Sequence, residues 1–257
     1  MVASLVMTPR AASYDVFGAK LTPLTLDEIL SALRAHVSAR EPCIVAYQNL
    51  HGLYVRLRDP IVDVLHRHPL TYVHIDGMPL IALCRLCGIP AQRRHRITLV
   101  DSIWPVLMLA ASQGWRVYFV GGTPAIVEAG ANAIRARLPS LDFRGHHGYL
   151  DTAGTHEVLQ DVRAFTPHLV IVGMGMGAQE RWVAQNLEGL APASVCLVGA
   201  CMEYLAGAVR TPPRWMGQNG CEWLFRLGEN PRRFWRRYLI EPWFVLAHIL
   251  SHRGGVT

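Results

Sequence analysis

Short apolar runs rich in β-branched and aromatic residues recur along the chain, and stretches with helical spacing of apolar residues lie between them. The runs cover residues 43–47, 71–75, 116–120, 169–172 and 195–198. Strands that alternate with helices in this way are typical of βαβ units, in which crossover helices join parallel strands. The pattern predicts an α/β fold with a Rossmann-like parallel sheet flanked by helices.

Two of the expected strands end in glycine-rich turns that lead into expected helices. Gly121 and Gly122 follow the third run, and Gly175 lies in the turn after the fourth. Such a turn places backbone N–H groups and a helix N-terminus at the carboxyl edge of the sheet, where open α/β folds bind phosphates. A nucleotide ligand fits this arrangement, but tight turns also use glycine for positive φ and close packing. From the glycines alone, both interpretations stay open.

Composition indicates a globular protein, because 51% of the 257 residues are hydrophobic and 17% are charged. We expect an α/β core over residues 1–209 and a membrane-associating helical appendage over residues 210–257. Residues 1–20 contain no continuous apolar stretch typical of secretory signals, and no run of about 18 apolar residues is present. The protein is therefore expected in the cytoplasm. Six cysteines, including one Cys-x-x-Cys pair at 84–87, are expected to be reduced.

Most of the net charge of +6 lies in the expected appendage, where eight arginines stand against three glutamates. Large aromatic residues alternate with the arginines, a pattern suited to an anionic and partly apolar surface. Residues 219–227 and 231–239 are predicted to form two short amphipathic helices with basic faces. In the second, four arginines have a spacing that gathers them on one side of the helix. They are Arg232, Arg233, Arg236 and Arg237.

Several partners suit a basic amphipathic helix of this kind. They are an anionic membrane surface, the core of the same protein, and a second copy in a homo-oligomer. The mixture of arginine with aromatic residues favours the membrane, where each basic residue contributes about 1 kcal/mol. Nucleic acid is not expected as a partner, because no nucleic-acid-binding motif is visible.

A series of short motifs extends from the first strand to the appendage, over residues 43–242. They are Asp76-Gly77, Arg96-x-Thr98-x-x-Asp101, Gly121-Gly122, His147-Gly148-Tyr149, Gln179-Glu180-x-Trp182, Gly199-Ala200, Ala206-Gly207, Arg210-x-Pro212, Glu222-Trp223-Leu224-Phe225-Arg226-Leu227, Asn230-Pro231-Arg232-Arg233 and Arg236-Arg237-Tyr238. With these motifs in this order, the chain resembles the WecG/TagA/CpsF family of glycosyltransferases.

The resemblance implies transfer of a sugar from a UDP-sugar donor to a polyprenyl-diphosphate-linked saccharide, in the synthesis of bacterial surface polysaccharides. It also implies inversion at the anomeric carbon, no metal or other cofactor, and a peripheral position on the inner face of the membrane. The sequence agrees with metal independence, because it contains no Asp-x-Asp pair to hold a divalent cation. The candidates for the acceptor diphosphate and the membrane surface are Arg210, Arg226, Arg232, Arg233, Arg236 and Arg237.

Asp76 is the candidate catalytic base. An inverting transfer needs a group that takes the proton of the acceptor hydroxyl. Asp76 directly follows the run 71–75, at the expected carboxyl end of a strand. The residues alone also fit a cap of the helix expected near Pro79, and the resemblance favours the base.

The other expected site residues surround the donor nucleotide. Gln179 and Glu180 are expected in the first turn of the helix after the second glycine turn, within reach of a nucleotide. Arg96 and Asp101 are expected to line or order the cleft, with a surface ion pair as the alternative. The remaining members of the donor set are Asn49, Gly121, Gly122 and Gly175.

Three segments depart from the family pattern: Tyr47-Gln48-Asn49, Gly177-Ala178 and Met202-Glu203. They keep open a catalytically inactive, membrane-associated scaffold of a polysaccharide assembly complex, because a fold does not guarantee an activity. A dinucleotide-binding oxidoreductase is less favoured. The segment 173–178 has Rossmann glycine spacing, but Glu203, the only nearby acid for a ribose, lies several residues beyond the next expected strand.

Overall fold

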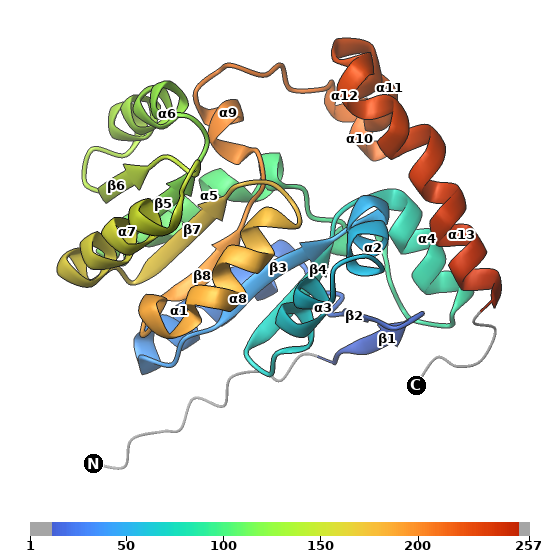
Figure 1. Ribbon diagram of the computed structural model, residues 1–257, viewed down its shortest axis with the longest axis horizontal. Helices are drawn as coiled ribbons and strands as arrows, with labels where there is room; N and C mark the ends of the chain where they lie inside the picture. Colours follow the sequence, from blue (N-terminus) through green and yellow to red (C-terminus); the bar gives the residue numbers. More distant parts are fainter. Residues whose placement is uncertain (1–11, 252–257) are drawn as a thin grey trace.

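The computed structural model describes residues 12–251, and its centre is a parallel β-sheet (Figure 1). Within this range the sheet has six strands, in the order β4-β3-β8-β7-β5-β6. Their bounds are β3 Ile44–Gln48, β4 Thr71–Ile75, β5 Arg116–Gly121, β6 Asp142–His146, β7 Leu169–Gly173 and β8 Ser194–Leu197. Every neighbouring pair is parallel, so the carboxyl ends of the strands share one edge. The predicted α/β class is confirmed.

Helices cover both faces of the sheet and make three layers (Figure 1). The helices of the core are α1 Leu26–Ala39, α2 Leu50–Arg56, α3 Pro60–Arg67, α4 Met78–Leu86, α5 Leu99–Ser112, α6 Pro124–Arg137, α7 Thr152–Phe165, α8 Ala178–Leu190 and α9 Cys201–Leu205, with a 3-10 turn at Arg93–His95. Residues of α2, α3, α7 and α8 pack on one face, and residues of α1, α5, α6 and α9 on the other. The cap of α1 is a capping box of Thr25 and Glu28, which supplies acceptors to its first amides.

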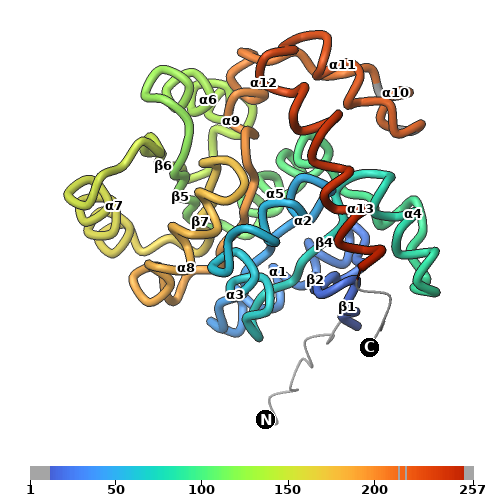
Figure 2. The backbone as a smooth tube through the Cα atoms, turned by 45° about the vertical axis from the view of Figure 1, so that its right-hand side comes forward, coloured from blue at the N-terminus to red at the C-terminus, as the bar shows by residue number. Residues whose placement is uncertain are grey.

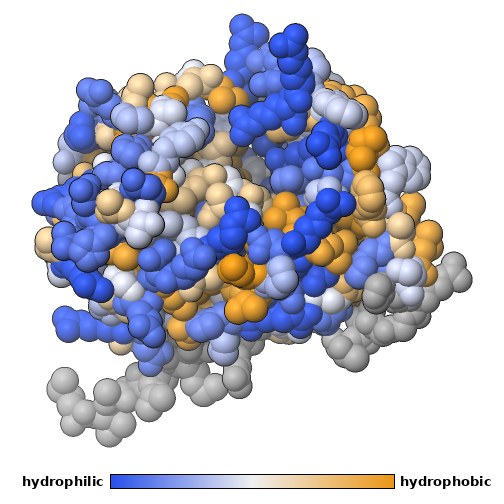
Figure 3. Space-filling view, in the orientation of Figure 1, coloured by the Kyte–Doolittle hydropathy of each residue, from blue (hydrophilic) through white to orange (hydrophobic). Residues whose placement is uncertain are grey.

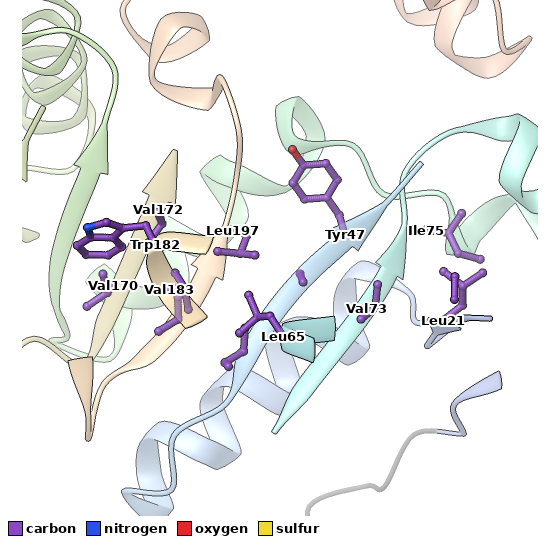
Figure 4. Packing of buried hydrophobic residues seen from close by; sticks show 14 of the residues in the cluster. Leu21, Tyr47, Leu65, Val73, Ile75, Val170, Val172, Trp182, Val183 and Leu197 are labelled. Carbon is purple, nitrogen blue, oxygen red and sulfur yellow. The ribbon is translucent and has the colours of Figure 1, made fainter. Parts of the chain in front are cut away.

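The hydrophobic core lies between the sheet and the two helical layers. All five residues of β7 are buried, as expected for a central strand covered on both faces. Figure 4 shows Val170 and Val172 of β7 close to Trp182 and Val183 of α8. The same view shows Tyr47 at the carboxyl end of β3. The core therefore fixes the strand ends, which carry the candidate site.

Three strands were not predicted from the apolar runs. β6 lies at the edge of the sheet, and Phe143 is its only buried residue. β1 Tyr14–Val16 and β2 Ala19–Leu21 form an antiparallel hairpin. Beyond it, the backbone of Thr22 donates to the carbonyl of Val73 in β4 over 2.7 Å, so the hairpin lies beside the other edge of the sheet.

The C-terminal segment is packed on the core as a chain of helices. They are α10 Arg214–Gln218, α11 Glu222–Glu229, α12 Pro231–Trp235, a π-helical turn at Arg236–Ile240, and α13 Glu241–Ser251. Figures 1 and 2 show α13 beside α2, with α10 to α12 at one end of the molecule. Val245 of α13 is only 3% exposed, and Phe244 packs on Tyr54 of α2 with ring centroids 5.9 Å apart. The helix predicted over residues 231–239 does not end there, because α12 continues through the π-helical turn into α13.

Residues 1–11 and 252–257 lie outside the described part of the chain. These ranges include much of the segment in which no secretory signal is expected, and Arg253 of the basic appendage. Between residues 12 and 251, no helix combines the length and the apolar character needed to cross a bilayer. The six cysteines, all within this range, are unpaired, which agrees with the expectation of reduced thiols.

Candidate active site

A pocket of about 210 Å³ lies at the carboxyl ends of β3 and β4, between the core and the C-terminal helices. Its walls come from the starts of α2 and α4 on one side, and from α11, the π-helical turn and the start of α13 on the other. Five of the expected site residues line it: Asn49, Asp76, Arg96, Arg226 and Arg237. The structure therefore brings together residues that are up to 188 positions apart in the sequence.

Asp76 and Asn49 are joined by a side-chain hydrogen bond. Asp76 follows β4 directly, and its backbone N–H donates to the carbonyl of Gln48 over 2.8 Å. Nδ2 of Asn49 donates to Oδ2 of Asp76 over 3.0 Å, while Oδ1 of Asn49 accepts from the backbone N–H of Gly52 and caps α2. A capping role for Asp76 is wrong, because the cap of α4 is Gly77 and no side chain bonds there. Asp76 is free to direct its second carboxylate oxygen into the pocket.

Two arginines of the appendage bring positive charge to this pocket. Burial by itself lowers the pKa of Arg226, but Tyr204, Tyr238, Asp76 and Glu222 raise it above the ordinary value. Nε of Arg237 is buried and has no hydrogen-bond partner within residues 12–251. Unused donors of guanidinium groups suit a diphosphate, whose oxygens accept charge-assisted hydrogen bonds.

Two ion pairs attach the appendage to the core beside the pocket. Nη2 of Arg96 donates to Oε1 of Glu222 in α11 over 2.6 Å, and Nδ1 of His51 lies 2.5 Å from Oε2 of Glu241 in α13. The side chains of Arg96 and Glu222 are 12% and 26% exposed, so this pair is not the surface ion pair considered for Arg96. Burial and the charge of Arg237 lower the pKa of His51, and the bond to Glu241 opposes that shift.

Gln179 and Glu180 lie beneath the turns that follow β7 and β8, and both are 0% exposed. Oε1 of Gln179 accepts from the backbone N–H of Gly199 over 2.9 Å, and its Nε2 donates to Oε1 of Glu180 over 3.0 Å. Oε2 of Glu180 accepts from the backbone N–H of Gly177. Burial and the charge of Glu180 raise the pKa of the neighbouring Tyr47 hydroxyl. In this arrangement the pair holds two turns in place, and its contact with the donor stays a prediction.

The glycine turns share the carboxyl edge with the pocket but do not line it. A Cβ at Gly121 would lie 2.3 Å from the carbonyl oxygen of Gly173, so close packing of two strand ends requires glycine there. Gly175 has φ +83°, and no atom lies within 4 Å of a Cβ built on it, so this turn has free space beside it. The backbone N–H of Gly148 donates to the carbonyl of Gly122. The next residue, Tyr149, is 76% exposed.

The remaining expected residues lie away from the pocket. Thr98 donates its hydroxyl to Oδ2 of Asp101 over 2.6 Å in the first turn of α5, and Arg210 is 3.9 Å from Glu229. The remaining arginines of the basic helix are exposed, in contrast to Arg237. They are Arg232, Arg233 and Arg236. The expected row of four is thus divided, because the π-helical turn that begins at Arg236 changes the helical spacing.

The pocket residues that were not predicted as site residues include His51, Trp223 and Tyr238, which carry polar or aromatic side chains. The motifs that contain Trp223 and Tyr238 were recognised, but no role followed from them. Among residues 12–251, no group of three or more His, Cys, Asp or Glu side chains is placed to hold a metal ion. Metal independence stays a prediction.

The Glycosyl transferase WecG/TagA/CpsF family matches residues 14–255 of the chain. The chain belongs to this family. Relatives include the N-acetylglucosaminyldiphosphoundecaprenol N-acetyl-beta-D-mannosaminyltransferases of two Staphylococcus aureus strains. That of strain NCTC 8325 / PS 47 is 28% identical over 227 residues, and that of strain MRSA252 is 27% identical. Each alignment covers 84% of this chain and 85% of the relative. The protein is a glycosyltransferase.

Proposed function

We propose that this glycosyltransferase moves a sugar from a UDP-sugar to a polyprenyl-diphosphate-linked saccharide, with inversion at the anomeric carbon and without a metal ion. The observation that carries the proposal is the position of Asp76, which faces a pocket that also contains Arg226 and Arg237. The names of the relatives support the acceptor class, because those enzymes act on N-acetylglucosaminyldiphosphoundecaprenol.

In the proposed reaction, Asp76 is the base. The acceptor hydroxyl attacks the anomeric carbon, its proton passes to the carboxylate, and the bond from that carbon to the β-phosphate oxygen of UDP breaks. The hydrogen bond from Asn49 supports this role, because it holds the carboxylate in one orientation at the pocket wall. The other carboxylate oxygen forms no hydrogen bond within residues 12–251, and so it is available to the acceptor.

Positive charge in the pocket supports diphosphate binding. Arg226 and Arg237 provide guanidinium donors in the pocket that Asp76 lines. Fixed cationic donors stabilise phosphate charge without the reorganisation that water requires, so they take the part that a divalent cation has in other transferases. The glycine turns on the same edge of the sheet, with the free space at Gly175, suit the uridine part of the donor.

The surface of the appendage supports contact with an anionic membrane. Ten large apolar side chains of the described part of the appendage are more than a third exposed. They are Trp215, Trp223, Leu224, Trp235, Leu239, Ile240, Trp243, Phe244, Leu246 and Leu250. Figure 3 shows hydrophilic residues over α11 and α12 at the top of the view and apolar residues beside α13 at its right. Exposed aromatic residues next to arginines suit the headgroup region of a bilayer, which is also where a polyprenyl-linked acceptor lies.

The test is transfer by the purified protein with EDTA present, across a panel of UDP-sugars and a short-chain polyprenyl-diphosphate saccharide. We expect product from one donor. Asp76→Asn removes the base and keeps the hydrogen-bonding shape, so it should lower the transfer rate at least about a hundredfold and leave UDP affinity and the melting temperature unchanged.

Two other outcomes contradict parts of the proposal. Transfer that stops with EDTA and returns with Mg²⁺ contradicts metal independence. Binding of neither UDP nor any UDP-sugar contradicts the transferase itself and favours the inactive scaffold.

A further inference from the structure

Gln48, the last residue of β3, buries an amide group without hydrogen-bonding it. Its side chain is 0% exposed, and neither Nε2 nor Oε1 has a partner among residues 12–251. Nearly all buried polar atoms in folded proteins form a hydrogen bond, because an unpaired one loses its contact with water and gains nothing in return. An amide with both atoms unpaired therefore requires an explanation.

The surroundings of this amide are tight and include a glycine-flanked loop. A Cβ built on Gly52, in the first turn of α2, would lie 1.8 Å from Oε1 of Gln48 and 2.8 Å from Sδ of Met176. The amide is thus enclosed between α2 and the loop after β7. In that loop Met176 lies between Gly175 and Gly177, which have φ values of +83° and +88°. Glycine at these two positions allows backbone rotations that other residues make only with strain.

Gln48 lies close to the place where the transferred sugar of the donor is expected. Its neighbour Asn49 holds Asp76 through the 3.0 Å hydrogen bond. The side chains of Gln48 and Asn49 both reach Gly52: Oδ1 of Asn49 accepts from its backbone N–H, and Oε1 of Gln48 lies 1.8 Å from a Cβ built on it. The amide is therefore one residue away from the group that orients the base. Of the parts of a UDP-sugar, the transferred sugar must lie closest to that base.

We propose that Gln48 is a specificity-determining residue, which hydrogen-bonds a neutral hydroxyl or acetamido substituent of the transferred sugar when the Met176 loop moves aside. This proposal rests on the proposed function. A carboxamide offers one acceptor and two donor hydrogens, which match the donors and acceptors of a sugar hydroxyl or an N-acetyl group. Binding of the sugar then supplies the partners that the amide lacks in the free protein.

The test replaces the amide by an apolar side chain of the same length, Gln48→Met. Loss of the unpaired polar atoms should raise the melting temperature of the free protein. Affinity for UDP should stay within about twofold, while affinity for the UDP-sugar and its kcat/KM should each fall about tenfold, the effect of one or two lost hydrogen bonds. The probes are UDP, UDP-glucose, UDP-N-acetylglucosamine and UDP-N-acetylmannosamine, measured by titration calorimetry and by the transfer assay.

The matched control is Gln113→Met, at the exposed end of α5, and it should change neither affinity nor kcat/KM. Gln48→Leu is a second variant in case Met is not accommodated. Unchanged preference for UDP-sugar over UDP in a stable Gln48 variant overturns the proposal. A fall in melting temperature in both Gln48 variants also overturns it, because such a fall indicates an internal partner for the amide. UDP binding by the wild-type protein distinguishes these results from a failure of the proposed function. If the proposed function fails, the wild-type protein binds neither UDP nor a UDP-sugar.

Discussion

Asn49 and Asp76 are joined by a hydrogen bond of 3.0 Å from Nδ2 of the amide to Oδ2 of the carboxylate. The same amide cannot turn freely, because its Oδ1 accepts from the backbone N–H of Gly52 and caps α2. The carboxylate is therefore held in one orientation by a helix start. Asn49 follows β3 and Asp76 follows the neighbouring strand β4. The hydrogen bond between their side chains joins these two strand ends into one site.

Asn49→Asp should move the pH profile of transfer. The new carboxylate keeps an acceptor for the cap of α2 but places a second negative charge beside Asp76. Two carboxylates at this distance disfavour each other's ionised forms. We expect the acidic limb of kcat/KM of the variant to move to higher pH, with a lower rate at neutral pH. The control, Asn219→Asp, changes an exposed residue of the appendage and should keep the wild-type profile. An unchanged acidic limb for Asn49→Asp contradicts Asp76 as the base.

The arginines of the appendage should separate into two groups by function. Arg226→Gln and Arg237→Gln remove donors from the pocket, and each should lower kcat/KM about a hundredfold, as loss of a donor to developing charge does in other enzymes. Binding to vesicles with anionic lipid should change little. Arg232→Gln and Arg233→Gln change exposed residues outside the pocket, and they should weaken vesicle binding with little effect on transfer to a water-soluble acceptor. Equal effects of all four on both assays contradict this division.

The strands of the sheet show how far the hydrophobic pattern reaches. β4 has the bounds Thr71–Ile75 that the apolar run gives, and β5, β7 and β8 differ from their runs by at most one residue at either end. Central strands are covered on both faces, so nearly every position is apolar and the run is visible. β6 could not be found in this way, because four of its five residues are not buried.

The hydrophobic pattern predicts only part of the pocket. That Asn49 and Asp76 meet follows from parallel strands, whose carboxyl ends share an edge. The sequence does not show which arginines of the appendage face these two residues, because helical spacing places both Arg236 and Arg237 on the basic side of the helix. The π-helical turn and the packing of α13 on α2 decide this, and both depend on contacts between distant parts of the chain. The same holds for Gln179 and Glu180, whose burial beneath two turns has no local signal.

Stability should fall between pH 6.5 and about 4 because of buried neutral histidines. Burial lowers the pKa of His66 and that of His74 to about 4, whereas an unfolded chain titrates near 6.5. Their pKa values are lower in the folded protein, so their contribution is fully present above about 6.5 and is lost as pH falls toward about 4. His66→Leu should make the free energy of unfolding, measured with urea, fall less steeply over this range. His156→Leu changes an exposed histidine and should keep the wild-type slope; an equal slope for His66→Leu would exclude this cause.

Gly52 should be intolerant of any side chain. A Cβ there would lie 1.8 Å from Oε1 of Gln48 and 2.8 Å from Sδ of Met176, so Gly52→Ala should lower the free energy of unfolding by about 1–3 kcal/mol through overpacking. Adding Gln48→Ala vacates the space, and the double variant should lose less than the sum of the two single changes. Gly228→Ala is the control, because its Cβ would meet no atom within 4 Å in α11. Additive losses in urea unfolding would mean that Gln48 is not what excludes a side chain at position 52.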